Sequence, residues 1–125
     1  MLKIRYKSNA PRRPPRVIVL GPPGSGRSTQ ARTLAQKFGL VHICVRTLLK
    51  NEIAKGGHLG NIIKTCTQEG TMVPDNYVNA IMEERLKQTD CRVKGFVMDS
   101  YPMTEFQMNN LKRLKIKPSL VVIFE

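Results

Sequence analysis

Residues 16–38 read RVIVLGPPGSGRSTQARTLAQKF, and this stretch decides the fold. The apolar run at 16–20 has the composition of a buried strand, and the glycine-rich run at 21–29 follows it directly. A helical pattern then begins at Gln30. A plain Gly/Pro turn could also join a strand to a helix, but both flanks favour an anion-binding turn.

The glycine-rich run matches the phosphate-loop pattern G-x-x-x-x-G-K-[ST], with Arg27 at the lysine position. Glycines let successive backbone N–H groups point at an anion, and the following helix adds its positive N-terminus. The Ser28 hydroxyl is a candidate ligand of Mg²⁺. The residues expected to surround the phosphates are Gly21, Gly24, Ser25, Gly26, Arg27, Ser28 and Thr29.

The rest of the chain alternates short apolar runs with helical patterns. The apolar runs lie at 16–20, 41–43, 95–98 and 120–124. The helical patterns lie at 30–38, 48–54, 59–68, 75–87, with Asp75 as its N-cap, and 104–114. Continuous apolar strands alternating with helices predict an α/β fold over 16–125, an open parallel sheet with helices on both faces. Its ligands collect at the carboxyl ends of the strands, where the glycine loop lies.

Positive charge is concentrated at the N-terminus. The net charge is +12, and eleven of the 21 Lys and Arg residues precede the first acid, Glu52. Prolines at 11, 14 and 15 predict an extended, solvated basic arm over 1–15, outside the core. A linker and a docking segment for an acidic partner both stay open. Nucleic-acid binding is disfavoured because Tyr6 is the arm's only aromatic residue.

Other features exclude several classes of protein. No apolar run approaches the roughly 20 residues of a membrane span, so we expect a cytoplasmic protein without membrane contact. Three widely spaced cysteines predict reduced, packed thiols. His42 and His58 have no ligand-like spacing, which favours structural roles. The only metal expected is the Mg²⁺ that accompanies a nucleotide.

Five segments in order resemble the adenylate kinases and related nucleoside monophosphate kinases. They are GPPGSGRSTQA at 21–31, LVHICVRTLLKNEI at 40–53, EGTMVPDNYV at 69–78, ERL at 84–86 and GFVMDSYPMTEFQ at 95–107. Within the family, the chain resembles domains of the multi-domain ciliary, or axonemal, adenylate kinases of eukaryotes. The resemblance implies a P-loop NTPase-like fold and transfer of the γ-phosphoryl group of ATP to AMP with Mg²⁺. It also implies a location in the cytoplasm, with the cilium and axoneme as the finer expectation.

The resemblance assigns roles on the ATP side. Arg27 stands where the family has its catalytic loop lysine, and a planar guanidinium does not replace a compact ammonium without cost. Asp99 stands where the family has the catalytic acid that holds Mg²⁺ through water. Ser28 and Asp99 are therefore the expected metal-side residues.

On the acceptor side, the resemblance places a monophosphate-binding insertion at 44–73. Val45 stands for the family's threonine, Lys50 for an arginine that grips the monophosphate, and Met103 for a second such arginine. Gln107 matches the residue that contacts the acceptor base, and the wall beside the base retains Met72 and Val73.

The chain stops after the fourth predicted strand, whereas the family continues with a lid and a last strand. The resemblance therefore implies a core without a lid, a bare sheet edge and weak catalysis. Two functions stay open: a kinase nucleotide core, or a degenerate kinase fold that serves as an interaction module of an assembly such as an axoneme complex. A protein partner would then dock on the basic arm or the open sheet edge. Deleting residues 1–15 is expected to leave nucleotide binding unchanged.

Overall fold

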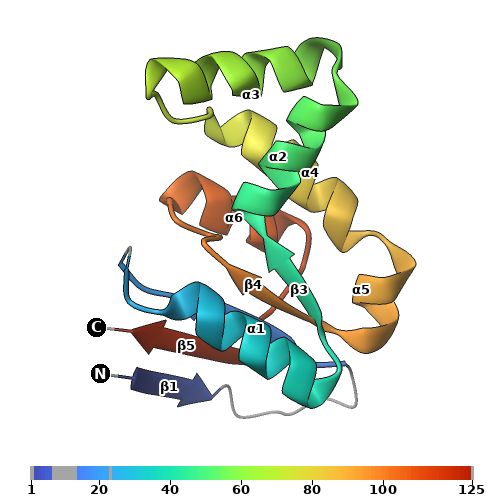
Figure 1. Ribbon diagram of the computed structural model, residues 1–125. Helices are drawn as coiled ribbons and strands as arrows, with labels where there is room; N and C mark the ends of the chain where they lie inside the picture. The colour runs from blue at the N-terminus through green and yellow to red at the C-terminus, as the bar shows by residue number, and fades with distance from the viewer. Residues whose placement is uncertain (1, 7–13, 23, 125) are drawn as a thin grey trace.

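A computed structural model describes residues 2–6, 14–22 and 24–124 of the chain, and its described part forms one five-stranded sheet with helices on both faces (Figure 1). The strands are β1 (Leu2–Tyr6), β2 (Arg16–Leu20), β3 (Val41–Cys44), β4 (Phe96–Asp99) and β5 (Leu120–Phe124). Their order in the sheet is β1-β5-β2-β4-β3. The four predicted strands are parallel to one another, which confirms the predicted α/β class.

Six helices accompany the sheet in the described residues. They are α1 (Arg27–Phe38), α2 (Val45–Lys55), α3 (Gly57–Glu69), α4 (Asp75–Leu86), α5 (Thr89–Lys94) and α6 (Glu105–Arg113). The alternation of side chains along β2 divides the core: Val17 and Val19 pack with α1, whereas Ile18 packs with α4 and α6. Each face of the sheet is therefore covered, as buried parallel strands require.

Helices α2 and α3 form a hairpin that extends away from the sheet (Figure 1). The two helices pack closely at Gly60, where an added Cβ would lie 2.5 Å from the carbonyl oxygen of Glu52. This hairpin lies within the segment 44–73 that the sequence assigns to an insertion.

The basic arm differs from its prediction. Residues Leu2–Tyr6 are not a solvated extension but form β1, which pairs antiparallel with β5. The sheet is therefore mixed, and the edge of β5 that was predicted to be bare is covered. At the other end of the arm, the carbonyl of Pro15 accepts the N–H of Phe96 at 3.0 Å. The remaining arm residues, 1 and 7–13, lie outside the described residues.

Several element boundaries also differ from the predictions. Helix α1 begins at Arg27 rather than Gln30, because it grows directly out of the glycine loop. Helix α5 was not predicted, since its six residues are too few to show a helical period. Asp75 is the first helical residue of α4, and Pro74 occupies the cap position. Among the described residues, no helix is long and apolar enough to cross a membrane.

Candidate functional site

The glycine loop connects the carboxyl end of β2 to the N-terminus of α1. Gly24 and Gly26 adopt positive φ angles of 78° and 85°, a left-handed conformation that side chains disfavour. The loop is held by two backbone contacts: Ser25 N–H donates to the Pro22 carbonyl at 3.2 Å, and Gln30 N–H donates to the Gly26 carbonyl at 3.0 Å. The positive end of the helix dipole therefore lies at the loop, as an anion site requires.

Gly21 has no room for a side chain. An added Cβ would lie 2.8 Å from the Ser25 hydroxyl and 2.9 Å from Cβ of Phe124, at the end of β5. The Ser25 hydroxyl itself is buried, and no residue in the described part of the chain bonds to it. A buried polar group without a partner costs about 1–3 kcal/mol. The loop thus contains a hydroxyl with free hydrogen-bonding capacity.

Arg27 bends back over the loop. Its guanidinium Nη1 donates a hydrogen bond to the Gly21 carbonyl, and the side chain is half-buried. One of the five N–H groups of the guanidinium is thus used by the loop itself. Arg27 is the first residue of α1, and the contact with phosphates expected of it stays a prediction.

Asp99 closes the site at the carboxyl end of β4, beside β2. Its side chain is fully buried, and its Oδ1 accepts hydrogen bonds from Ser28 Oγ at 3.4 Å and from Ser100 Oγ at 3.1 Å. Its Oδ2 accepts a hydrogen bond from Nε2 of His42. Burial raises the pKa of Asp99, but the hydrogen bond and charge of His42 and the hydrogen bonds of the two serine hydroxyls together hold that pKa below the ordinary value of an aspartate. The carboxylate is therefore ionised at neutral pH.

His42 is a site residue that sequence reasoning missed. It was expected to be structural because it lacks ligand-like spacing, but β3 lies beside β4 and brings its ring to Asp99. In the strand register Cys44 lies opposite Asp99, and His42 is on the same face two residues earlier. The sequence could have shown this pairing only if the strand order had been known.

Ser28 and Asp99 can hold Mg²⁺. A hydroxyl and a carboxylate oxygen are the hard ligands that this ion prefers. The described part of the chain has no cluster of three or more His, Cys, Asp or Glu residues that could form a cage. The residues therefore fit an ion that completes its coordination with water and phosphate oxygens.

The predicted acceptor residues are spread over three elements. Val45 and Lys50 lie on α2, and Lys50 is exposed. Met72 is 82% exposed. Its neighbour Val73 and Val45 each pack against the part of the core that contains Ile18 and the buried residues of α4. The structure thus brings Val45 and Val73 to the same cluster but leaves Lys50 and Met72 facing solvent.

Gln107 is buried, and both the oxygen and the nitrogen of its side-chain amide are hydrogen-bonded. Its Oε1 accepts the Met103 N–H at 2.6 Å, and its Nε2 donates to Oδ1 of Asp75 at 3.0 Å. Thr104, the N-cap of α6, accepts the Gln107 N–H at 3.1 Å and donates to Oδ2 of Asp75 at 2.8 Å. Asp75, which was predicted only as a helix cap, therefore joins the start of α4 to the start of α6. Met103 contributes its backbone to this network, and its side chain is 52% exposed.

The family model for adenylate kinase matches residues 19–125, which include the loop, Asp99 and Gln107. The chain belongs to the adenylate kinase family. This confirms the resemblance found in the sequence.

Individual adenylate kinases show the same similarity. The chain is 42% identical to an adenylate kinase of Fervidobacterium nodosum over 78% of its own length and 44% of that protein. It is 40% identical to adenylate kinase 8 of Homo sapiens over 93% of its own length and 24% of that protein. It is 38% identical to a probable chloroplastic adenylate kinase 2 of Oryza sativa over 90% of its length and 39% of that protein. The chain thus spans less than half of each of these adenylate kinases.

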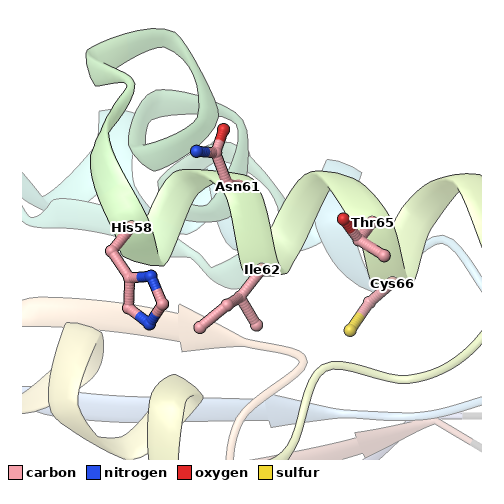
Figure 2. Close-up of a pocket in the computed structure, with 5 residues that line it drawn as sticks. All are labelled: His58, Asn61, Ile62, Thr65 and Cys66. Atoms are coloured by element: carbon pink, nitrogen blue, oxygen red, sulfur yellow. The ribbon is translucent and has the colours of Figure 1, made fainter.

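A separate hollow of about 290 Å³ lies on α3 of this adenylate kinase chain (Figure 2). Figure 2 shows side chains of one helix lining it: His58, Asn61, Ile62, Thr65 and Cys66. None of them belongs to the predicted nucleotide site. His58, Asn61 and Thr65 are exposed, so the hollow is a shallow surface feature.

Proposed function

We propose that this chain is the nucleotide-binding core of an adenylate kinase and binds ATP with Mg²⁺ at Gly21–Thr29. The observation that carries the proposal is the contact between Ser28 and Asp99. The hydroxyl at the start of α1 and the carboxylate at the end of β4 lie 3.4 Å apart although 71 residues separate them in sequence. This arrangement joins a phosphate loop to an ionised metal-side acid.

Each part of the loop has a role in this proposal. The backbone N–H groups of Gly21, Gly24 and Gly26 and the N-terminus of α1 receive phosphate oxygens, and Arg27 adds positive charge. Ser28 and Asp99 would hold the metal. Mg²⁺ supplies neutralisation of the charge on the β- and γ-phosphates, which is the main demand of phosphoryl transfer.

We further propose AMP as the acceptor, with slow transfer in this chain. Methionine at 103 and lysine at 50 replace arginines that hold the acceptor phosphate in the resembling family. A charge-assisted hydrogen bond contributes about 1.5–3 kcal/mol. Loss of one such bond at Met103 corresponds to about 10- to 100-fold weaker acceptor binding.

Calorimetric titration with ATP in the presence of Mg²⁺ tests the binding proposal. We expect saturable binding that weakens on removal of Mg²⁺ and in Ser28→Ala. The matched control is Thr65→Ala, which removes an exposed hydroxyl on α3 and should bind ATP as the unmodified chain does. No saturation at millimolar ATP would contradict the proposal.

A coupled assay with ATP and AMP tests the proposal of slow transfer. We expect little turnover in the unmodified chain and a lower KM for AMP in Met103→Arg, because the guanidinium restores a phosphate contact. Turnover comparable to that of a complete adenylate kinase in the unmodified chain would refute the proposal.

The internal bonding of Gln107 favours a second function, that of a degenerate kinase fold acting as an interaction module. In this alternative ATP binds without transfer, and the basic arm contacts a protein partner, for example in an axoneme complex. The test is the location of the tagged protein in ciliated cells. Enrichment on the axoneme supports this function, and an even cytoplasmic distribution contradicts the ciliary assignment.

A further inference from the structure

Strand β5 lies between β2 and β1, and β1 is the edge strand on this side of the sheet. On one side β5 pairs in parallel with β2, and on the other it pairs antiparallel with β1, with Leu2 opposite Phe124 and Tyr6 opposite Leu120. Within β5, Val122 is buried, and Leu120, Val121 and Phe124 are partly buried and pack against the core on the two faces of the sheet. Two backbone ladders restrain β5 in addition to this packing.

The carboxyl end of β5 is also a wall of the phosphate loop. Phe124 approaches Gly21 so closely that a Cβ on this glycine would lie 2.9 Å from the Phe124 Cβ. The register places Leu2, the first residue of β1, opposite Phe124. The last rung of the β1–β5 ladder thus lies at the contact between β5 and the first residue of the loop.

We propose that Leu2–Tyr6 is a built-in edge strand that keeps the end of β5 against the phosphate loop. The N-terminal segment then supports nucleotide binding without touching the nucleotide. It does so by pairing with the side of β5 that faces away from β2. The effect on nucleotide affinity rests on the proposed function, whereas the strand pairing does not. This inference replaces the expectation that removal of the arm leaves nucleotide binding unchanged.

Two kinds of variant test the strand. The first deletes Leu2–Tyr6 and keeps Met1. The second kind consists of two single variants of the full chain, Ile4→Pro and Arg5→Pro. Because alternate N–H groups of an edge strand face its partner, one of the two prolines removes a ladder hydrogen bond and the other removes an N–H that faces solvent. The two proline variants therefore serve as matched controls for each other.

The readouts are hydrogen exchange of residues 120–124, the NMR amide signals of Gly21, Gly24 and Gly26, and the dissociation constant for ATP with Mg²⁺. In the deletion we expect faster exchange in β5, shifted signals of the loop glycines and weaker ATP binding. One of the two proline variants should show about 3- to 10-fold lower protection in β5 than the other.

Unchanged exchange in β5 after the deletion, or equal protection in the two proline variants, would overturn the strand pairing. Unchanged loop glycine signals in the deletion would overturn the support of the loop. Both measurements are made without nucleotide. If the unmodified chain fails to bind ATP, the proposed function fails, and these two measurements still decide the present inference.

Discussion

Replacing Gln107 tests whether this residue primarily braces the fold. The change Gln107→Leu removes the donor to Asp75 and the acceptor of the Met103 N–H while filling a similar volume at a buried position. We expect a lower free energy of unfolding and unchanged binding of ATP with Mg²⁺, since the residue lies outside the phosphate loop.

The magnitude follows from the two bonds. The bond to the Asp75 carboxylate is charge-assisted and contributes about 1.5–3 kcal/mol. The Met103 N–H belongs to a residue with a half-exposed side chain, so water can replace part of its bond, and we assign it less than about 1 kcal/mol. The expected loss is about 2–3 kcal/mol, or a decrease of about 1–2 M in the urea midpoint.

Urea unfolding of the full chain measures this loss. Asn109→Leu is the matched control because Asn109 is an exposed amide on the same helix, and we expect its effect to be within about 0.5 kcal/mol. The double variant Asp75→Ala, Gln107→Leu should be less destabilised than the sum of the single variants. If Gln107→Leu lowers the free energy of unfolding no more than Asn109→Leu does, and the slope of that free energy against urea is unchanged, the stabilising role of Gln107 is refuted.

Two further predictions concern the core. Burial raises the pKa of the Cys91 thiol to about 11, so the stability that this neutral thiol contributes is present below pH 9 and is lost as the pH rises toward 11. The free energy of unfolding of Cys91→Ala should therefore fall less steeply over this pH range than that of the unmodified chain. Tyr101→Phe should cost about 1–3 kcal/mol by urea unfolding, because the hydroxyl donates to Asn79 at 2.6 Å and accepts from Asn110 at 3.1 Å, and both partners are buried. A loss of less than about 0.5 kcal/mol in Tyr101→Phe would contradict this second prediction.

The parallel part of the fold could be predicted because its signals are local. Each of the four strands is a continuous apolar run, and the runs at 16–20 and 120–124 coincide with β2 and β5. Strand β1 was missed although LKIRY alternates apolar and basic residues, which is a strand pattern. The prolines at 11, 14 and 15 were taken to describe the whole arm, but a proline affects only its neighbours.

The candidate site likewise has a part that could be predicted from the sequence and a part that could not. The loop residues are contiguous in sequence, so their position around the N-terminus of α1 could be predicted. The contacts of His42 with Asp99 and of Asp75 with Gln107 join elements that are 57 and 32 residues apart. Such contacts depend on strand order and helix packing, which a single sequence does not contain. The binding and catalytic roles assigned to all the predicted site residues stay predictions.

The two halves of the site differ in free hydrogen-bonding capacity, and this difference bears on function. At the loop, the Ser25 hydroxyl is without a partner among the described residues, and Ser28 reaches Asp99 only at the long distance of 3.4 Å. At the acceptor side, Gln107 and Asp75 are already bonded to each other. A ligand gains most where polar groups lack partners, because elsewhere it must first break the bonds that it replaces. A phosphate at the loop would gain new bonds, whereas at Gln107, where the acceptor base is proposed to bind, Asp75 and a backbone N–H already use part of the amide's bonding capacity. The chain should therefore bind a donor nucleotide more tightly than an acceptor.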